Sequence, residues 1–401
     1  MKYPFLFALL FFVGCKTHQA SDFEYSNKVD TTDHPIELQN KKTYAVDGVF
    51  ADNQFDGARL NDFSKLNDQT FQATIAPENF PINPSPWYAF KLWAAEDRLI
   101  NLVLHYENGA HRYHPTVSFD GINWEKLDSN FVAKKDSTDA ILNLNIGADT
   151  LWLAAQEIAN SAHTKKWCET LAAHPSTNFK TIGKSKLGRD LYFLDINEGN
   201  PHKKEIIAVI SRQHPPEVTG YFAMQAFIEE ILADHSLASQ FRKKYRILVF
   251  PLMNPDGVDL GHWRHNAGGI DLNRDWAYYH QPEIRQVADF MVKLAAENKS
   301  DIILGMDFHS TYYDIYYTNK DPNEPLPGFN NLWIFGIQQS IEETAKISPA
   351  YPTSPVSKNW FYNQFGAEGI VYEIGDTTPR DFIKKKGQVS AVEMMALLIY
   401  R

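Results

Sequence analysis

The pattern of apolar residues in this chain changes once, near residue 152, and that change predicts two folded domains. From about residue 43 to residue 152, the apolar residues form short runs of strand length separated by turn residues. From residue 153 onward, similar runs are separated by segments long enough for helices. Strands in close succession are typical of a β sandwich, whereas strands alternating with helices are typical of an α/β sheet. We therefore predict an all-β sandwich domain over 43–152, followed by an α/β domain over 153–401.

The first region has the features of a small all-β domain. Its apolar runs include 87–92 and 99–104, which have the length of strands rather than helices. The segment 118–124 contains Asp120-Gly121, a dipeptide that supplies the positive φ angles of a tight hairpin turn. With 44% hydrophobic and 13% aromatic residues, the chain of 401 residues can fill two cores. We assign the aromatic residues of this region to core and turn packing; a sugar-binding surface is the alternative.

Four apolar runs in the second region are predicted strands, and each has polar residues at or just beyond its C-terminal end. The runs span 206–210, 247–250, 302–306 and 370–374. Open α/β sheets place their functional sites at the carboxyl ends of their strands. The segments at these ends contain His214 with Glu217, the stretch 264–276, His309 and Glu373.

The first residues have the features of an export signal and are excluded from the fold. Lys2 precedes an apolar run over 3–13, which is shorter than the roughly 20 residues of a spanning helix. The end of this run and the two residues that follow, Phe12-Val13-Gly14-Cys15, resemble a bacterial lipobox, with an ordinary signal peptide as the alternative. We predict a lipoprotein-type signal over 1–15, a lipid anchor to a membrane at Cys15, and a polar tether over 16–42. The protein would then be exported and face the periplasm or the cell surface, and Cys168 would remain as a single buried thiol.

The charge balance excludes one large class of partner. The chain has 39 Lys and Arg against 49 Asp and Glu, for a formal net charge of −10, and its basic runs at 242–244 and 384–386 are short. Binding of duplex nucleic acid requires a basic face that displaces counterions. We therefore predict no nucleic-acid partner, and we infer no obligate protein partner.

The spacing His-x-x-Glu suggests a metal site, although it occurs four times. The four pairs are His34/Glu37, His202/Glu205, His214/Glu217 and His280/Glu283. Only His214 directly follows a buried type of strand and precedes an apolar helix that begins near Glu217. Two such side chains can bind one Zn²⁺, and a distant histidine completes three protein ligands with a fourth position open for water. The alternative for His214 is a turn histidine with no metal.

Three further segments follow Arg212-Gln213-His214-Pro215-Pro216-Glu217 in a fixed order. They are Asn254-Pro255-Asp256-Gly257, Asp271-Leu272-Asn273-Arg274-Asp275-Trp276 and Asp307-Phe308-His309-Ser310. In this order, the region from about residue 152 to residue 401 resembles the zinc metallocarboxypeptidases related to carboxypeptidase A. The β domain in front looks most like the cytosolic carboxypeptidase branch. The resemblance implies a catalytic α/β domain with a mixed central sheet flanked by helices, one zinc ion per chain, and a peptide substrate.

The resemblance also implies roles for individual residues. His214, Glu217 and His309 match the zinc ligands, and Glu373 matches the general base. The chemistry is consistent, because zinc lowers the pKa of bound water to about 7 and a nearby carboxylate can accept the proton. The alternative for Glu373 is a carboxylate at a strand end, paired with a Lys or Arg.

Other matches concern the substrate. Arg264 matches the arginine that stabilises the oxyanion of the tetrahedral intermediate, and Asn273 with Arg274 matches the pair that holds the terminal carboxylate. Asp271 matches the carboxylate that orients the first zinc histidine, here His214. Arginine suits the first two tasks because its planar guanidinium keeps its charge and can bind a carboxylate through two donors. Surface contacts, or a turn cap in the case of Asp271, are the alternatives.

Two residues concern how the site closes over a bound substrate and which terminal residue of the substrate it prefers. Tyr351 precedes Glu373 by 373 − 351 = 22 positions, a separation similar to that of the family's mobile tyrosine from its base. Lys358 aligns with the segment in which the family selects the terminal side chain, and a cation there predicts a preference for terminal Glu or Asp. The alternative is an exposed lysine on a loop. Pro216 stands where the digestive members have a basic residue, so their contact farther up the peptide is not expected.

The sequence leaves two other functions open. An amidase or deacylase of related fold could remove an acyl group from an amino acid, although Asn273 and Arg274 favour a peptide carboxylate. A lipid-anchored binding protein could use its β domain and keep a non-catalytic zinc site. Glu373 argues against the second, because a binding module has no need of a base there.

Overall fold

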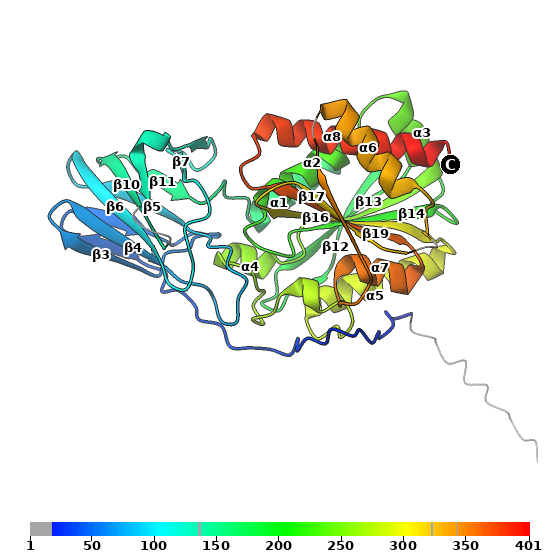
Figure 1. Ribbon diagram of the computed structural model, residues 1–401, viewed down its shortest axis with the longest axis horizontal. Coiled ribbons are helices and arrows are strands. Elements are labelled where there is room, and N and C mark those ends of the chain that lie inside the picture. The colour runs from blue at the N-terminus through cyan, green and yellow to red at the C-terminus, as the bar shows by residue number, and fades with distance from the viewer. Residues whose placement is uncertain (1–17, 135–137, 322–323, 343) are drawn as a thin grey trace, which may run out of the picture.

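The computed structural model describes residues 18–134, 138–321, 324–342 and 344–401, and it has two parts (Figure 1). The predicted signal over 1–15, with Cys15, lies outside the described residues. An all-β domain comes first and an α/β domain follows, so the predicted fold class is confirmed. None of the helices in the described ranges combines the length and hydropathy needed to span a bilayer.

The β domain is a sandwich of two sheets. Its strands are β1 (Thr43–Val46), β2 (Val49–Asp52), β3 (Asp62–Asn67), β4 (Thr70–Ile75), β5 (Ala89–Ala94), β6 (Arg98–Tyr106), β7 (Thr116–Ser118), β8 (Glu125–Lys126), β9 (Val132–Lys134), β10 (Asp139–Ile146) and β11 (Leu151–Ala154). One sheet has the order β1-β2-β5-β11-β7-β8 and the other the order β3-β4-β6-β10-β9. Inward-facing side chains of most of these strands form one buried cluster between the sheets. The predicted hairpin over 118–124 joins the antiparallel strands β7 and β8, but its turn is not the tight two-residue type, because the connection spans 119–124 and of Asp120 and Gly121 only Gly121 has a positive φ.

The α/β domain is built on one large mixed sheet. Its strands are β12 (Thr177–Lys184), β13 (Asp190–Ile196), β14 (Glu205–Ser211), β15 (Tyr245–Phe250), β16 (Ile302–Thr311), β17 (Ile315–Asn319), β18 (Lys346–Ala350) and β19 (Glu368–Gly375). The spatial order is β12-β13-β15-β14-β16-β19-β17-β18. The four central strands β15, β14, β16 and β19 run parallel, so their carboxyl ends meet at one edge. These strands contain the four runs that the sequence predicts.

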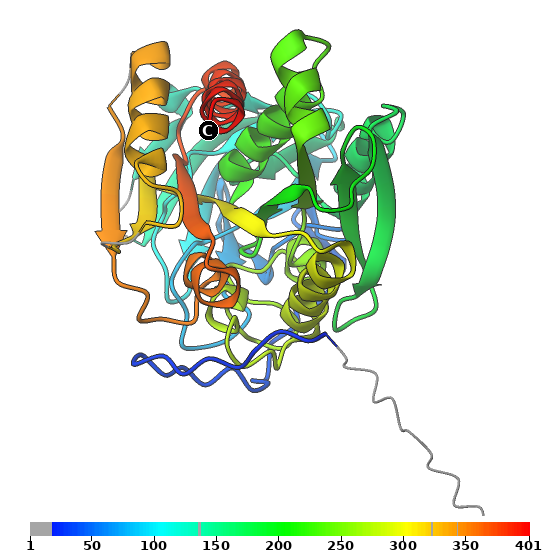
Figure 2. The ribbon, with the colours of Figure 1, turned by 90° about the vertical axis from the view of Figure 1, so that its right-hand side faces the viewer.

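Helices cover both faces of this sheet. They are α1 (Ser161–Leu171), α2 (Val218–Ile231), α3 (Ser236–Lys244), α4 (Pro255–Leu260), α5 (Pro282–Asn298), α6 (Phe329–Ile341), α7 (Ser357–Phe365) and α8 (Arg380–Ile399). Figure 2 shows α2, α3, α6 and α8 on one side of the sheet and α5 and α7 on the other. Strand alternation explains the two cores, because Ile207 and Val209 face the first layer while Ile206 and Ala208 face the second.

Helix α2 packs unusually close to strand β16, and a glycine makes this possible. A Cβ added to Gly220 would lie 2.1 Å from the carbonyl oxygen of His309, far inside contact distance. The Gly220 N–H also donates to the Ser310 hydroxyl at 2.8 Å. The close approach fixes the start of α2 relative to the end of β16, where two segments of the predicted site lie.

The segment that precedes the β domain does not behave as the predicted tether over 16–42. From Ala20 it is bound to the α/β domain, its last residues bind the β domain, and we call residues 18–42 the N-terminal strap (Figure 2, dark blue). Tyr25 and Thr31 are buried, at 4% and 0% exposure. The Tyr25 hydroxyl accepts from Asn363 at 3.0 Å, and the Thr31 hydroxyl donates to Asp275 at 2.6 Å. The segment has few large apolar residues, which favoured a tether, but its polar groups find partners on the α/β domain and hold it there.

Candidate metal centre

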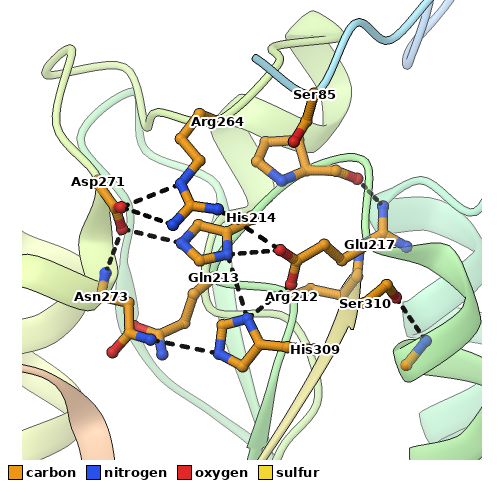
Figure 3. Close-up of polar contacts among 12 residues, drawn as sticks. Ser85, Arg212, Gln213, His214, Glu217, Arg264, Asp271, Asn273, His309 and Ser310 are labelled. Carbon is orange, nitrogen blue, oxygen red and sulfur yellow. Dashed lines mark hydrogen bonds and ion pairs between the residues drawn. The ribbon is translucent and has the colours of Figure 1, made fainter. Parts of the chain in front are cut away.

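Three side chains from different elements meet at the carboxyl edge of the sheet. His214 lies in the turn after β14, Glu217 immediately precedes α2, and His309 lies near the end of β16. All three are buried, and their ligand atoms lie within 4.8 Å of one another. The Nδ1 atoms of the two histidines are 3.1 Å apart, and each contacts a Glu217 oxygen, at 2.8 Å from His214 and 2.6 Å from His309 (Figure 3). The structure thus brings together the three predicted ligands.

The outer nitrogens of both histidines contact aspartates. His214 Nε2 lies 2.9 Å from Asp271 Oδ1, and His309 Nε2 lies 2.7 Å from Asp307 Oδ2. A carboxylate at Nε2 favours the proton on that nitrogen, which leaves the Nδ1 lone pair of each ring directed at the centre of the cluster. Burial opposes ionisation of Glu217, but the two histidines outweigh it and hold its pKa well below the ordinary value. The rings lower the pKa of Glu217 in their charged forms, and, against the opposing effect of burial, Asp307 and Glu217 raise the pKa of His309 in turn. A metal ion would bind both rings in their neutral form, in place of the Nδ1 protons, and two imidazoles and one carboxylate converging in this way fit the ligand set of a zinc ion.

Asp307 has a role that the sequence reasoning did not assign. It is fully buried, and besides contacting His309 it accepts hydrogen bonds from Gln213 Nε2 at 2.6 Å and from the Ser357 hydroxyl. The sequence could have predicted this role. Residues two positions apart on a strand face the same side of the sheet, and Asp307 stands two positions before His309. Asp307 therefore orients His309 as Asp271 orients His214.

Arg264 lies beside the metal-binding side chains. Its Nε donates to Asp271 Oδ2 at 3.0 Å, and its Nη1 is 3.7 Å from Glu217 Oε1. Its side chain is 11% exposed, and although burial lowers the pKa of the guanidinium, Asp271 and Glu217 outweigh that effect and raise it. A fixed cation is thereby held next to the place where a metal would bind.

Asn273 and Arg274 form the adjoining wall, in a short 3-10 helix over Leu272–Arg274. Asn273 Nδ2 is 3.5 Å from His309 Nε2, and its Oδ1 accepts from the Ser357 N–H at 2.9 Å. The Arg274 side chain is 38% exposed, and its Nη1 donates to the Asn273 carbonyl oxygen at 2.8 Å. These two residues therefore extend the site from the buried histidines towards solvent.

Glu373 lies next to His309 on the neighbouring strand. The two residues are directly paired in the parallel register of β16 and β19, so their side chains leave the sheet on the same side. Glu373 Oε2 is buried and has no hydrogen-bond partner among the described residues. Burial, together with the nearby Glu217, raises the pKa of Glu373 to about 8. Among the described residues, no Lys or Arg side chain pairs with Glu373 at hydrogen-bond distance. The alternative of a paired strand-end carboxylate is therefore not observed.

Tyr351 and Lys358 occupy different environments. Tyr351 follows β18, is 60% exposed, and lies under the Lys320 ammonium at 5.1 Å from the ring centre, apart from the buried cluster. Lys358, in the first turn of α7, is only 6% exposed, so the alternative of an exposed loop lysine is wrong. Its ammonium donates to two amide oxygens, those of Asn319 at 2.6 Å and Asn359 at 2.8 Å. Burial lowers the pKa of Lys358 to about 8.

Comparison with known proteins agrees with this geometry. A family model described as zinc carboxypeptidase matches residues 164–393. Cytosolic carboxypeptidase 2 of Xenopus tropicalis is 33% identical over 45% of this chain, and an uncharacterized protein of Zymomonas mobilis is 27% identical over 61% of it. The matched stretches span only 18% and 62% of those relatives, respectively.

Solved structures extend the likeness to the β domain. A putative carboxypeptidase A from Shewanella denitrificans superposes with a TM-score of 0.75 at 20% identity, over 87% of this chain and 98% of its own. At that identity the likeness concerns the fold. The family model covers more than half of the chain, and the chain therefore belongs to the zinc carboxypeptidase family, which confirms the resemblance noted in its sequence.

Replacing Asp307 by Asn should weaken zinc binding. The amide keeps the shape of the side chain but loses the charge that fixes His309, and loss of such an outer partner typically costs about 10- to 100-fold in metal affinity. Competition with a chelator measures the effect. Asp195→Asn is the matched control, because Asp195 is also buried in this sheet but pairs with Arg246 near the start of β15. Equal affinities for the two variants would contradict the role given to Asp307.

Proposed function

We propose that this member of the zinc carboxypeptidase family hydrolyses the C-terminal peptide bond of peptides, using one zinc ion held by His214, Glu217 and His309. The observation that carries the proposal is the Glu373 carboxylate, which lies beside a three-ligand metal site and has a buried oxygen without a partner among the described residues. A zinc ion at this site would act as a Lewis acid and make a water molecule more acidic. A site that only binds a metal has no use for such a carboxylate.

Each neighbouring residue then has a chemical task. Glu373 takes a proton from the attacking water and later gives it to the leaving amine. Arg264 donates to the oxygen that gains negative charge in the tetrahedral intermediate, and such an interaction is stronger in the transition state than in the bound substrate.

Asn273 and Arg274 make the enzyme an exopeptidase under this proposal. They lie beside the zinc ligands, and the Arg274 guanidinium is partly exposed, so that a substrate carboxylate can reach it. A guanidinium can bind a carboxylate through two parallel hydrogen bonds, which fixes its direction as well as its position. Tyr351, on its exposed loop, would close over the bound peptide.

Lys358 supports a preference for peptides that end in Glu or Asp. The N–H of its neighbour Ser357 binds Asn273, so the first turn of α7 directly adjoins the residues assigned to the terminal carboxylate. In the described part of the chain, Lys358 Nζ has amide oxygens as hydrogen-bond partners and no carboxylate in an ion pair. Although the buried Glu368 carboxylate acts on this ammonium from beyond ion-pair distance, a desolvated cation bound only to amide oxygens still discriminates in favour of a ligand that brings a carboxylate.

We further propose that the protein is exported and held at a membrane by a lipid on Cys15. The apolar run over 3–13 and the lipobox-like end of that run support this location. No nucleic-acid partner is proposed, in keeping with the net charge of −10.

Glu373→Gln should abolish single-residue trimming while leaving zinc in place. The amide keeps the size of the side chain but cannot accept a proton, and general-base catalysis contributes about 10²- to 10⁴-fold. Mass spectrometry of peptides ending in Glu, Leu and Lys measures the trimming, and metal analysis should give one zinc per chain in both proteins. Zinc without any trimming by the wild type would favour an amidase or a binding protein instead.

The preference for terminal Glu should fall as the pH rises. Lys358, with a pKa of about 8, loses its charge as the pH passes that value, and kcat/KM follows the titration of the free enzyme. The ratio of kcat/KM for Glu-ended to Leu-ended peptides should therefore fall about tenfold between about pH 7 and pH 9. Titration of an enzyme group such as Glu373 changes kcat/KM for both peptides equally, so its effect cancels in the ratio. In Lys358→Met the ratio should be low and independent of pH; a ratio like that of the wild type would refute the assignment.

Cys15→Ser should release the protein from membranes. With an expressed full-length chain in a Gram-negative host, the wild type should sediment with membranes and be extracted by detergent, because acyl chains bury their methylenes in the bilayer. The variant should remain in the soluble fraction at equal expression. Finding both proteins in the same fraction would exclude the anchor.

A further inference from the structure

The backbone that carries Arg264 is bound by a residue of the other domain. Glu78 lies in the connection between β4 and β5 of the β domain and is fully buried, at 0% exposure. Its Oε2 accepts from the Trp263 N–H at 2.7 Å, and its Oε1 accepts from the N–H groups of Arg264 at 2.9 Å and His265 at 2.7 Å. One carboxylate thus binds three successive backbone donors, with the oxyanion arginine in the middle.

These donors have no partner within their own secondary structure. They lie between the end of α4 at Leu260 and the short helix that begins at Leu272. Three adjacent N–H groups aimed the same way form a concave anion site, and a buried N–H without an acceptor is costly. Burial opposes ionisation of Glu78, but His262, Arg59 and His265, with the backbone donors, outweigh it and hold its pKa below the ordinary value.

The next residue of the β domain extends the same contact. Asn79 Oδ1 lies 2.6 Å from His265 Nδ1, and Asn79 Nδ2 donates to the Gly269 carbonyl oxygen at 3.0 Å. Gly269 has a φ of +72°, and a Cβ there would lie 2.5 Å from Asn79 Nδ2, so the two segments could not approach so closely with another residue. The stretch 263–269 is therefore held at both ends by the β domain.

We propose that Glu78 is a positioning residue that sets the guanidinium of Arg264 for the oxyanion. This inference rests on the proposed carboxypeptidase function. The chain of contact runs from the Glu78 carboxylate through the Arg264 N–H to the guanidinium, whose Nε and Nη2 meet Asp271 at 3.0 and 2.9 Å. Oxyanion stabilisation depends on donors fixed before the reaction, and displacement by about 1 Å can cost about 10²-fold in rate. The β domain is thereby part of the active site.

A simple docking contact between domains would have a different consequence. Loss of docking would lower stability, and any loss of activity would be the same whether or not Arg264 is present. A positioning role predicts a loss that depends on Arg264. A double-mutant cycle separates the two, because residues that act through one another have non-additive effects.

The test compares Glu78→Gln in the wild-type chain and in an Arg264→Ala chain. Gln keeps the shape of Glu but replaces one acceptor oxygen by an NH₂ group, which must then face a backbone N–H. We expect kcat to fall about tenfold or more with KM changed less than about twofold in the wild-type background, and no further fall beside Arg264→Ala. Glu37→Gln is the matched control, because Glu37 has an exposed side chain and contacts the Glu78 carbonyl only through its own backbone N–H.

A second measurement does not depend on catalysis. In the metal-free protein, amide hydrogen exchange over 263–265 should speed up in Glu78→Gln, while the strands of the large sheet keep their protection. If Glu78→Gln does not fold, Glu78→Asp retains the charge on a shorter stem and should show a smaller loss in both measurements. Unchanged exchange, unchanged kcat, or an equal loss beside Arg264→Ala would each overturn the proposal. Failure of the wild type to trim peptides would instead overturn the proposed function, and the exchange measurement would still decide whether Glu78 holds this segment.

Discussion

Buried negative charge at the carboxyl edge of the large sheet is the constraint on which the rest of the site depends. Glu217, Asp271 and Asp307 all lie around two histidines, and isolated carboxylates in such surroundings are strongly unfavourable. Arg264 compensates part of this charge through Asp271 and Glu217. A divalent cation among the three ligand atoms would compensate much of the remainder, so metal binding and folding of this edge should be coupled.

The same constraint explains how the sheet is arranged. The parallel register of β16 and β19 places His309 beside Glu373, and the close packing of α2 on β16 at Gly220 brings Glu217 to the same place. A slip of one residue in the pairing of β19 with β16 would turn Glu373 to the opposite face of the sheet, away from His309. The positions of the charged groups therefore follow from the register of the sheet and from one glycine.

Much of this site could be predicted from the sequence, because its residues stand at the ends of recognisable strands. The context of His214 separated its pair with Glu217 from three chance occurrences, and the order of four segments identified the family. Asp307 was missed although strand alternation pointed to it. Glu78 gave no local signal, because its partners are backbone N–H groups 185 to 187 positions away, and backbone groups have the same chemistry in every residue. The N-terminal strap was missed for a similar reason: polar side chains with partners on a distant surface look like a solvated linker.

The N-terminal strap changes what a lipid on Cys15 would mean for the geometry of the protein at a membrane. A free tether over residues 16–42, which are 27 residues, would let the enzyme range about 90 Å from its anchor, at roughly 3.3 Å per extended residue. Because the first hydrogen bonds of the strap are those of Ala20 and Ser21, only about 17 Å of chain would separate Cys15 from the folded protein. Such an enzyme would stay within a short distance of the bilayer, with its α5 and α7 face towards it. Its substrates would then have to reach the membrane surface.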